Sequence, residues 1–176
     1  MKLLVFHIIS KPDTEVFKTI YEDLPEISVY INPRSEEVRD ILKSNPGITA
    51  IFMGHGDNRG LYDQELKKYV VDSKTVPLLL GRTVIGIWCY AAEFADINNL
   101  HGFFTSNFIS NPEEAHLEGI FEEDENIEEL NLRFAERVHM LLESEEELSL
   151  WVSELQSLAR TRIEKYNYEA LSYYEQ

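Results

Sequence analysis

One cysteine and one His-Gly pair are the residues of this chain best suited to chemistry. Cys89 is the only thiol among the 176 residues, and His55 is followed by Gly56. A thiol attacks once it has lost its proton, and a nearby imidazole can accept that proton or pair with the thiolate. The N–H groups of Gly56 and Cys89 could donate to a developing oxyanion, and the dipole of a helix after Cys89 would favour thiolate. These features predict a catalytic dyad of Cys89 and His55 with a backbone oxyanion hole.

Two acidic residues near the proposed dyad could orient the imidazole. Asp57 and Asp63 follow His55 closely, and a third group often fixes the ring of a catalytic histidine. The alternative is turn chemistry, which aspartate commonly supplies in such loops. Both interpretations stay open for these two residues.

Metal and cofactor sites are not indicated by the sequence. His55 with Asp57 has no second His or Cys at ligand spacing, so the usual zinc patterns fail. The glycines around His55 do not have the G-x-G-x-x-G spacing of a dinucleotide loop. We expect neither a metal nor a cofactor, and we expect structural or exposed roles for the other histidines: His7, His101, His116 and His139.

The elements that must position the dyad alternate between strand and helix patterns. Apolar runs of strand length cover Leu3 to Ile9, Ile27 to Ile31, Ile48 to Met53, Thr83 to Trp88 and Phe103 to Ile109. Helical patterns follow at Thr14 to Leu24, at Ser35 to Leu42, at Gln64 to Val71, after Cys89, and at Pro112, where Asn111 is the expected cap. This alternation predicts an α/β domain with a mostly parallel sheet and helices on both faces.

The dyad residues each follow a predicted strand directly. The 34 residues from His55 to Cys89 are enough for one crossover that contains a helix, so their strands should be neighbours. Functional groups of parallel sheets gather beyond the carboxyl ends of the strands. The sequence therefore predicts that both side chains meet at this edge.

The C-terminal part of the chain has a different character. We divide the chain into an α/β domain, residues 1–120, and an acidic extension, residues 121–176, which is helical from about Ile127 and packs on or extends the same domain. The acidic run from Glu122 to Glu129 is an exposed face or, alternatively, a docking surface for a basic partner. The helices could also bind a regulatory protein or form a homo-oligomer.

Composition and charge exclude several classes of function. The net charge is −16, from 16 Lys and Arg against 32 Asp and Glu, which argues against nucleic-acid binding because that requires a basic surface. The opening MKLLVFHII lacks a cleavage site, and no apolar run is long enough to span a bilayer. A single cysteine suits a reducing compartment. We expect a soluble, cytoplasmic protein without membrane or nucleic-acid partners.

Two stretches of the chain resemble the caspase-like peptidases. IFMGHGDNRGLYD and VIGIWCYAAEFA, both apolar strands that end in the dyad residues, are similar to segments of a group that includes caspases, metacaspases, gingipains, clostripain, separase and CHAT-domain proteases. The resemblance covers about residues 1–115. It implies a three-layer caspase-like fold and a cysteine endopeptidase that acts on protein or peptide substrates through an acyl-enzyme. Caspases have Gln-Ala-Cys where this chain has Ile-Trp-Cys, so their specificity for aspartate is not implied.

Two other interpretations remain beside the peptidase. A core cysteine commonly acts as a small buried hydrophobe, and Trp88 and Tyr90 could bury this one. The chain would then be a catalytically inactive interaction module whose acidic helical tail binds a protein partner. A flavodoxin-like or receiver-like domain is less favoured, because the first strand ends in His7-Ile-Ile-Ser and not in an acidic pair.

Overall fold

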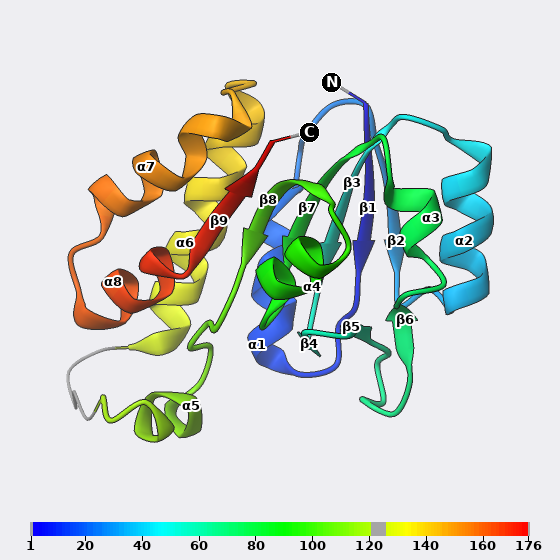
Figure 1. Ribbon diagram of the computed structural model, residues 1–176. Helices are drawn as coiled ribbons and strands as arrows, with labels where there is room; N and C mark the ends of the chain where they lie inside the picture. Colours follow the sequence, from blue (N-terminus) through cyan, green and yellow to red (C-terminus); the bar gives the residue numbers. More distant parts are fainter. Residues whose placement is uncertain (1, 121–125, 176) are drawn as a thin grey trace.

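The fold is built around a six-stranded sheet, which Figure 1 shows at the centre of the molecule. The computed structural model describes residues 2–120 and 126–175. The strand order is β2-β1-β3-β7-β8-β9. Five of these strands are parallel: β1 (Leu3–His7), β2 (Ile27–Ile31), β3 (Thr49–Met53), β7 (Thr83–Ile87) and β8 (His101–Thr105). The predicted mostly parallel α/β sheet is confirmed.

Helices cover both faces of the sheet. The helices of the described residues are α1 (Pro12–Glu15), the 3₁₀ helix η1 (Val16–Ile20), α2 (Ser35–Ser44), α3 (Val76–Leu79), α4 (Ala91–Ile97), α5 (Pro112–Leu117), α6 (Ile127–Glu143), α7 (Leu148–Leu158) and α8 (Arg162–Glu169), of which α5 lies beyond the edge of the sheet. One hydrophobic core joins the sheet to η1, α6 and α7, and a second core on the other face joins it to α2, α3 and α4. The domain therefore has three layers.

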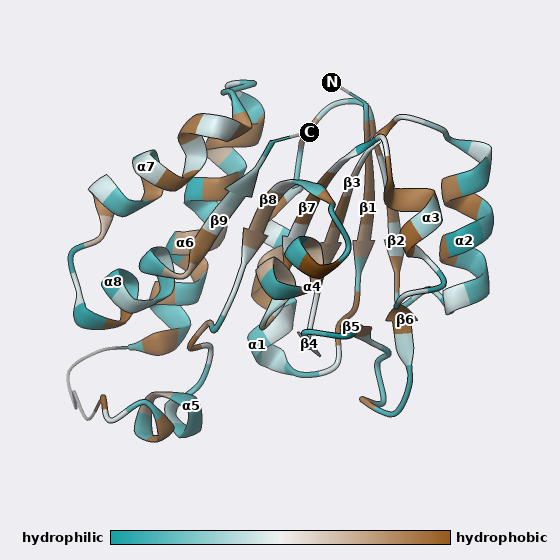
Figure 2. Ribbon diagram, in the orientation of Figure 1, coloured by the Kyte–Doolittle hydropathy of each residue, from teal (hydrophilic) through white to brown (hydrophobic). Residues whose placement is uncertain are grey.

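The central strands are apolar on both faces because both faces are covered by helices. In β1, Val5 belongs to one core and Phe6 to the other, and their β3 partners, Ile51 and Phe52, divide in the same way. Figure 2 shows the hydrophobic colouring along these strands. This two-sided burial explains why the strands are continuous apolar runs in the sequence.

The connection between β3 and β7 differs from the prediction. The helix predicted over Gln64 to Val71 is wrong, because this part of the chain forms a small antiparallel sheet of β4 (Gly56–Asp57), β5 (Gly60–Tyr62) and β6 (Tyr69–Val71). Aromatic and β-branched residues fill β6, and two of them, Val70 and Val71, are buried against the second core. Strand propensity and this packing outweigh the weak helical spacing.

The helix predicted from Thr14 to Leu24 is also shorter in the structure, where α1 and η1 together end at Ile20. The helix start at Pro112 is confirmed, since the Asn111 side chain accepts a hydrogen bond from the N–H of Glu114 at 3.0 Å.

The C-terminal part packs on the α/β domain and extends its sheet. Helix α6 packs against η1, and β9 (Leu171–Tyr174) pairs antiparallel with β8. The sequence had indicated helix throughout this part, so β9 is an addition. Residues 121–125, which include the start of the acidic run from Glu122 to Glu129, lie outside the described residues. In the described part of the chain, no helix has the length and apolar character needed to cross a membrane.

Candidate active site

The dyad residues lie at one edge of the sheet because their strands are neighbours. Strands β3 and β7 pair in parallel, with Met53 opposite Ile87, and the N–H of Gly54 donates to the carbonyl of Ile87 at 3.1 Å. His55 and Cys89 each follow two residues after this last pair. The prediction that their strands are neighbours is confirmed, and both side chains line the same small pocket.

Asp13 is the hydrogen-bond partner of His55. Its Oδ1 lies 3.3 Å from Nε2 of His55, and the two side chains are only 13% and 17% exposed. Burial alone would raise the pKa of Asp13, but the hydrogen bond and charge of His55 hold this pKa below its usual value. The Nε2–H group donates to a carboxylate, which leaves Nδ1 as the ring nitrogen that can exchange a proton.

Asp57 and Asp63 do not orient His55 in the structure, although the sequence had offered them for this role. The Asp57 carboxylate accepts hydrogen bonds from Arg59, Tyr62 and Tyr69 within the small sheet. The Asp63 carboxylate accepts from the N–H of Lys67. Strand β4 begins directly after His55 and forms a hairpin with β5, so both carboxylates make their hydrogen bonds within the β4–β6 unit.

Sequence reasoning missed Asp13 because it lies 42 residues before His55. One signal was present: the residue follows β1, whose carboxyl end lies at the same sheet edge as those of β3 and β7. A search of every loop at this edge for acidic residues would have included it.

The surroundings of Cys89 favour the neutral thiol over the thiolate. Sγ donates a weak hydrogen bond to the carbonyl of Phe108 at 3.6 Å. Burial raises the pKa of Cys89 to about 11, and the negative charges of Glu114, Asp13 and Glu93 add to the rise. This is the reverse of the expected lowering by an imidazole and a helix dipole. In the described residues no hydrogen bond joins Sγ to His55, so the two groups share the pocket without being engaged.

Gly56 lies beneath the indole of Trp88. A Cβ at position 56 would come within 2.2 Å of the indole Cδ1 and 2.5 Å of the carbonyl oxygen of Gly60. The Trp88 Nε1–H group donates to the carbonyl of Asp57 at 3.2 Å, which ties the hairpin to the end of β7. A glycine is therefore required for packing here. The oxyanion role of the Gly56 and Cys89 amides stays a prediction.

The free space at the dyad is small, about 20 Å³. That volume suits about one water molecule. A wider cleft of about 1180 Å³ adjoins the pocket, and Asp13 and Ser110 line both. The ionisable residues of the cleft are Lys11, Asp13, Glu113, Glu114, Glu128 and Glu129. The ionisable side chains of this cleft are thus mainly carboxylates.

Three of the other histidines, His7, His101 and His139, make hydrogen bonds with residues other than the dyad. His7 is fully buried, with Nε2 donating to the Thr14 carbonyl at 2.7 Å and Nδ1 accepting from the Tyr21 hydroxyl at 3.0 Å. This contact holds the segment that carries Asp13.

Over residues 2–120 and 126–175, no group of three or more His, Cys, Asp or Glu side chains is arranged to hold a metal ion.

Comparison with known proteins adds no family assignment. No protein-family model matches the chain, and no curated protein matches it. The similarity of the two strand-end segments to caspase-like peptidases therefore stays a prediction. The structure itself shows an α/β domain with a mostly parallel sheet, in which Asp13, His55 and Cys89 come together at the carboxyl edge.

Proposed function

We propose that the chain is a cysteine peptidase of the caspase-like type, in which Cys89 is the nucleophile and His55 is the acid and base. The supporting observation is that three side chains from separate parts of the chain, Asp13 on α1 and His55 and Cys89 after β3 and β7, line one pocket at the carboxyl edge of the sheet. Parallel α/β sheets carry functional groups at this edge. Asp13 acts as a positioning residue that holds the imidazole ring.

Each half of the reaction, acylation and deacylation, passes one proton through His55. The thiol proton passes to His55 while Sγ bonds to the peptide carbonyl carbon, and the N–H groups of Cys89 and Gly56 hold the oxyanion. The C–N bond then breaks and His55 returns the proton to the leaving amine. Water then gives a proton to His55 and attacks the thioester carbonyl, the C–S bond breaks to release the carboxylic acid, and His55 returns the proton to the Cys89 thiolate.

The adjoining cleft favours a cationic substrate. Five of its six ionisable residues are acidic, and all of them lie on the N-terminal turns of α1, α5 and α6 or beside them. A lysine or arginine near the scissile bond would gain from these charges, whereas an acidic peptide would be repelled. We expect peptides with Lys or Arg next to the cleavage site to be preferred.

The test is cleavage of a diverse peptide library followed by mass spectrometry. Wild type is compared with Cys89→Ala and His55→Ala, and an electrophilic peptide probe reports covalent labelling of the thiol. Under conditions that open the pocket, we expect wild type to cleave and both variants to be inactive. Absence of both cleavage and probe labelling in wild type, under conditions that open the pocket, would show that the proposal is wrong.

A non-catalytic interaction module is the second candidate. The observation that favours it is the Cys89 thiol itself, whose burial raises its pKa to about 11 and which has little free space beside it. If the thiol is inert, iodoacetamide should not label it while the chain is folded and should label it only after denaturation. A thiol that becomes reactive in the folded chain supports the peptidase.

A further inference from the structure

The segment of residues 106–111, which we call the strap, forms one wall of the pocket around Cys89. It connects β8 to α5 (Figure 1). Phe108 and Ser110 line the pocket, and the Phe108 carbonyl accepts the thiol hydrogen bond. Access to the sulfur therefore depends on where the strap lies.

A side chain of helix α8 forms hydrogen bonds with the backbone at the middle of the strap. The Asn167 side chain accepts from the N–H of Ile109 at 2.8 Å and donates to the carbonyl of Ile109 at 3.1 Å. Asn167 is 3% exposed and Ile109 is 1% exposed. The Asn167 amide thus bonds Ile109 as the backbone of a neighbouring strand would. The buried N–H and carbonyl groups of Ile109 would both lose this partner if the amide were removed.

Helix α6 holds the strap on either side of Ile109. Asn131 donates through Nδ2 to the carbonyl of Ser110 at 2.8 Å. The ring of Phe134 packs against the ring of Phe108, with centroids 4.9 Å apart. Three consecutive strap residues are thus each fixed by a side chain of the C-terminal helices.

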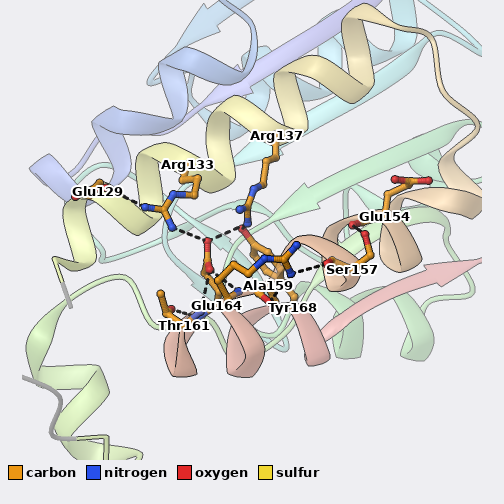
Figure 3. A network of polar contacts seen from close by, with 10 residues as sticks. Glu129, Arg133, Arg137, Glu154, Ser157, Ala159, Thr161, Glu164 and Tyr168 are labelled. Carbon is orange, nitrogen blue, oxygen red and sulfur yellow. Dashed lines mark hydrogen bonds and ion pairs between the residues drawn. The ribbon is translucent and has the colours of Figure 1, made fainter. Parts of the chain in front are cut away.

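The two helices are joined by ion pairs centred on Glu164 (Figure 3). Its Oε1 accepts from Arg137 at 2.9 Å and from Arg133 at 3.2 Å. Oε2 accepts from the N–H groups of Arg160 and Thr161. Glu164 and Asn167 are both buried on α8, three residues apart, so these contacts set the place from which Asn167 reaches the strap.

We propose that the C-terminal helices are an autoinhibitory clamp, which keeps the strap closed over Cys89 until the contact between Asn167 and Ile109 is broken. The closed pocket has about 20 Å³ of free space, which is too small for a peptide carbonyl and its flanking atoms. Displacement of the strap removes one wall of the pocket and frees the thiol hydrogen. The inhibition of peptidase activity rests on the proposed function, whereas the closure of the pocket by the strap does not.

The experiment measures how fast iodoacetamide labels the full-length chain. Cys89 is the only cysteine, so one mass increment reports one site. We expect Asn167→Ala to label at least tenfold faster than wild type. The matched control is Asn45→Ala, which removes an amide hydrogen bond to the carbonyl of Ile41 on α2, across the sheet from α8; it should label like wild type.

Global unfolding must be separated from opening of the strap. Labelling through the strap should be independent of low urea concentrations, while labelling through unfolding should accelerate with urea. If Asn167→Ala does not fold, Asn131→Ala, which releases only the carbonyl of Ser110, is used, and a threefold or greater acceleration is expected.

Two results would overturn the clamp: a folded Asn167→Ala or Asn131→Ala that labels at the wild-type rate, or a wild type that already labels as fast as a free thiol. A variant that labels rapidly but cleaves no peptide leaves the clamp standing and counts against the proposed peptidase.

Discussion

Replacement of Glu164 by glutamine should destabilise the fold by about 3 kcal/mol at neutral pH. The carboxylate is 1% exposed and accepts four hydrogen bonds, two from guanidinium groups and two from backbone N–H groups. Glutamine keeps one acceptor oxygen and turns an NH₂ group toward two of these donors. Hydrogen bonds to charged groups contribute about 1.5 to 3 kcal/mol each, and breaking a buried pair costs about 3 to 5 kcal/mol. Arg133 is 34% exposed and keeps Glu129, which places the effect at the lower end of that range.

The effect of Glu164→Gln should also depend on pH. Burial by itself would raise the pKa of Glu164, but hydrogen bonds from Arg160 and Thr161 and the nearby arginines hold it below its ordinary value of 4.5. A lowered folded-state pKa means that the stabilisation is complete above the unfolded-state value and is lost as pH falls through the folded-state value. The difference between wild type and variant should therefore shrink below about pH 4.5.

The assay is urea denaturation followed by circular dichroism at pH 7 and at pH 4. Glu154→Gln is the matched control, because it makes the same change of charge at an exposed position of α7 and should alter stability by less than about 0.5 kcal/mol. A loss below about 1 kcal/mol for Glu164→Gln at pH 7, or a loss that grows at low pH, would refute this account of the α6–α8 contact.

Three further predictions concern the pocket. Gly56→Ala should displace the Trp88 indole and cost about 2 kcal/mol of stability, seen as a lower urea midpoint and altered tryptophan fluorescence; an unchanged midpoint would contradict the close contact. Asp13→Asn should leave a folded protein whose peptidase kcat falls about 100-fold with little change in KM, and a loss below threefold would remove Asp13 from a positioning role. Because the pKa of Cys89 is raised to about 11, iodoacetamide labelling of wild type should increase about tenfold per pH unit from pH 7 to 10, whereas a plateau below pH 9 would indicate an activated thiol.

The sequence alone determined the central parallel strands of the sheet and the placement of His55 and Cys89 at its carboxyl edge. Strands β1, β3 and β7 are buried on both faces, so their sequences are continuous apolar runs that can be recognised locally. His55 and Cys89 follow two of these runs, and the carboxyl ends of neighbouring parallel strands share an edge. Element order was therefore enough to bring the two side chains to one pocket.

Only the tertiary structure decided what surrounds the dyad. Asp13 reaches His55 across 42 residues, and Asn167 reaches Ile109 across 58, by contacts that depend on how helices dock and leave no local pattern. The β4–β6 unit and β9 were missed because their strand character depends on the surfaces and edges that they cover. The pKa of Cys89 was expected to fall and instead rises, because burial and the negative charges of Glu114, Asp13 and Glu93 disfavour the thiolate. Short-range sequence patterns specify strands, whereas the burial of a side chain and the charges around it depend on residues from distant parts of the chain.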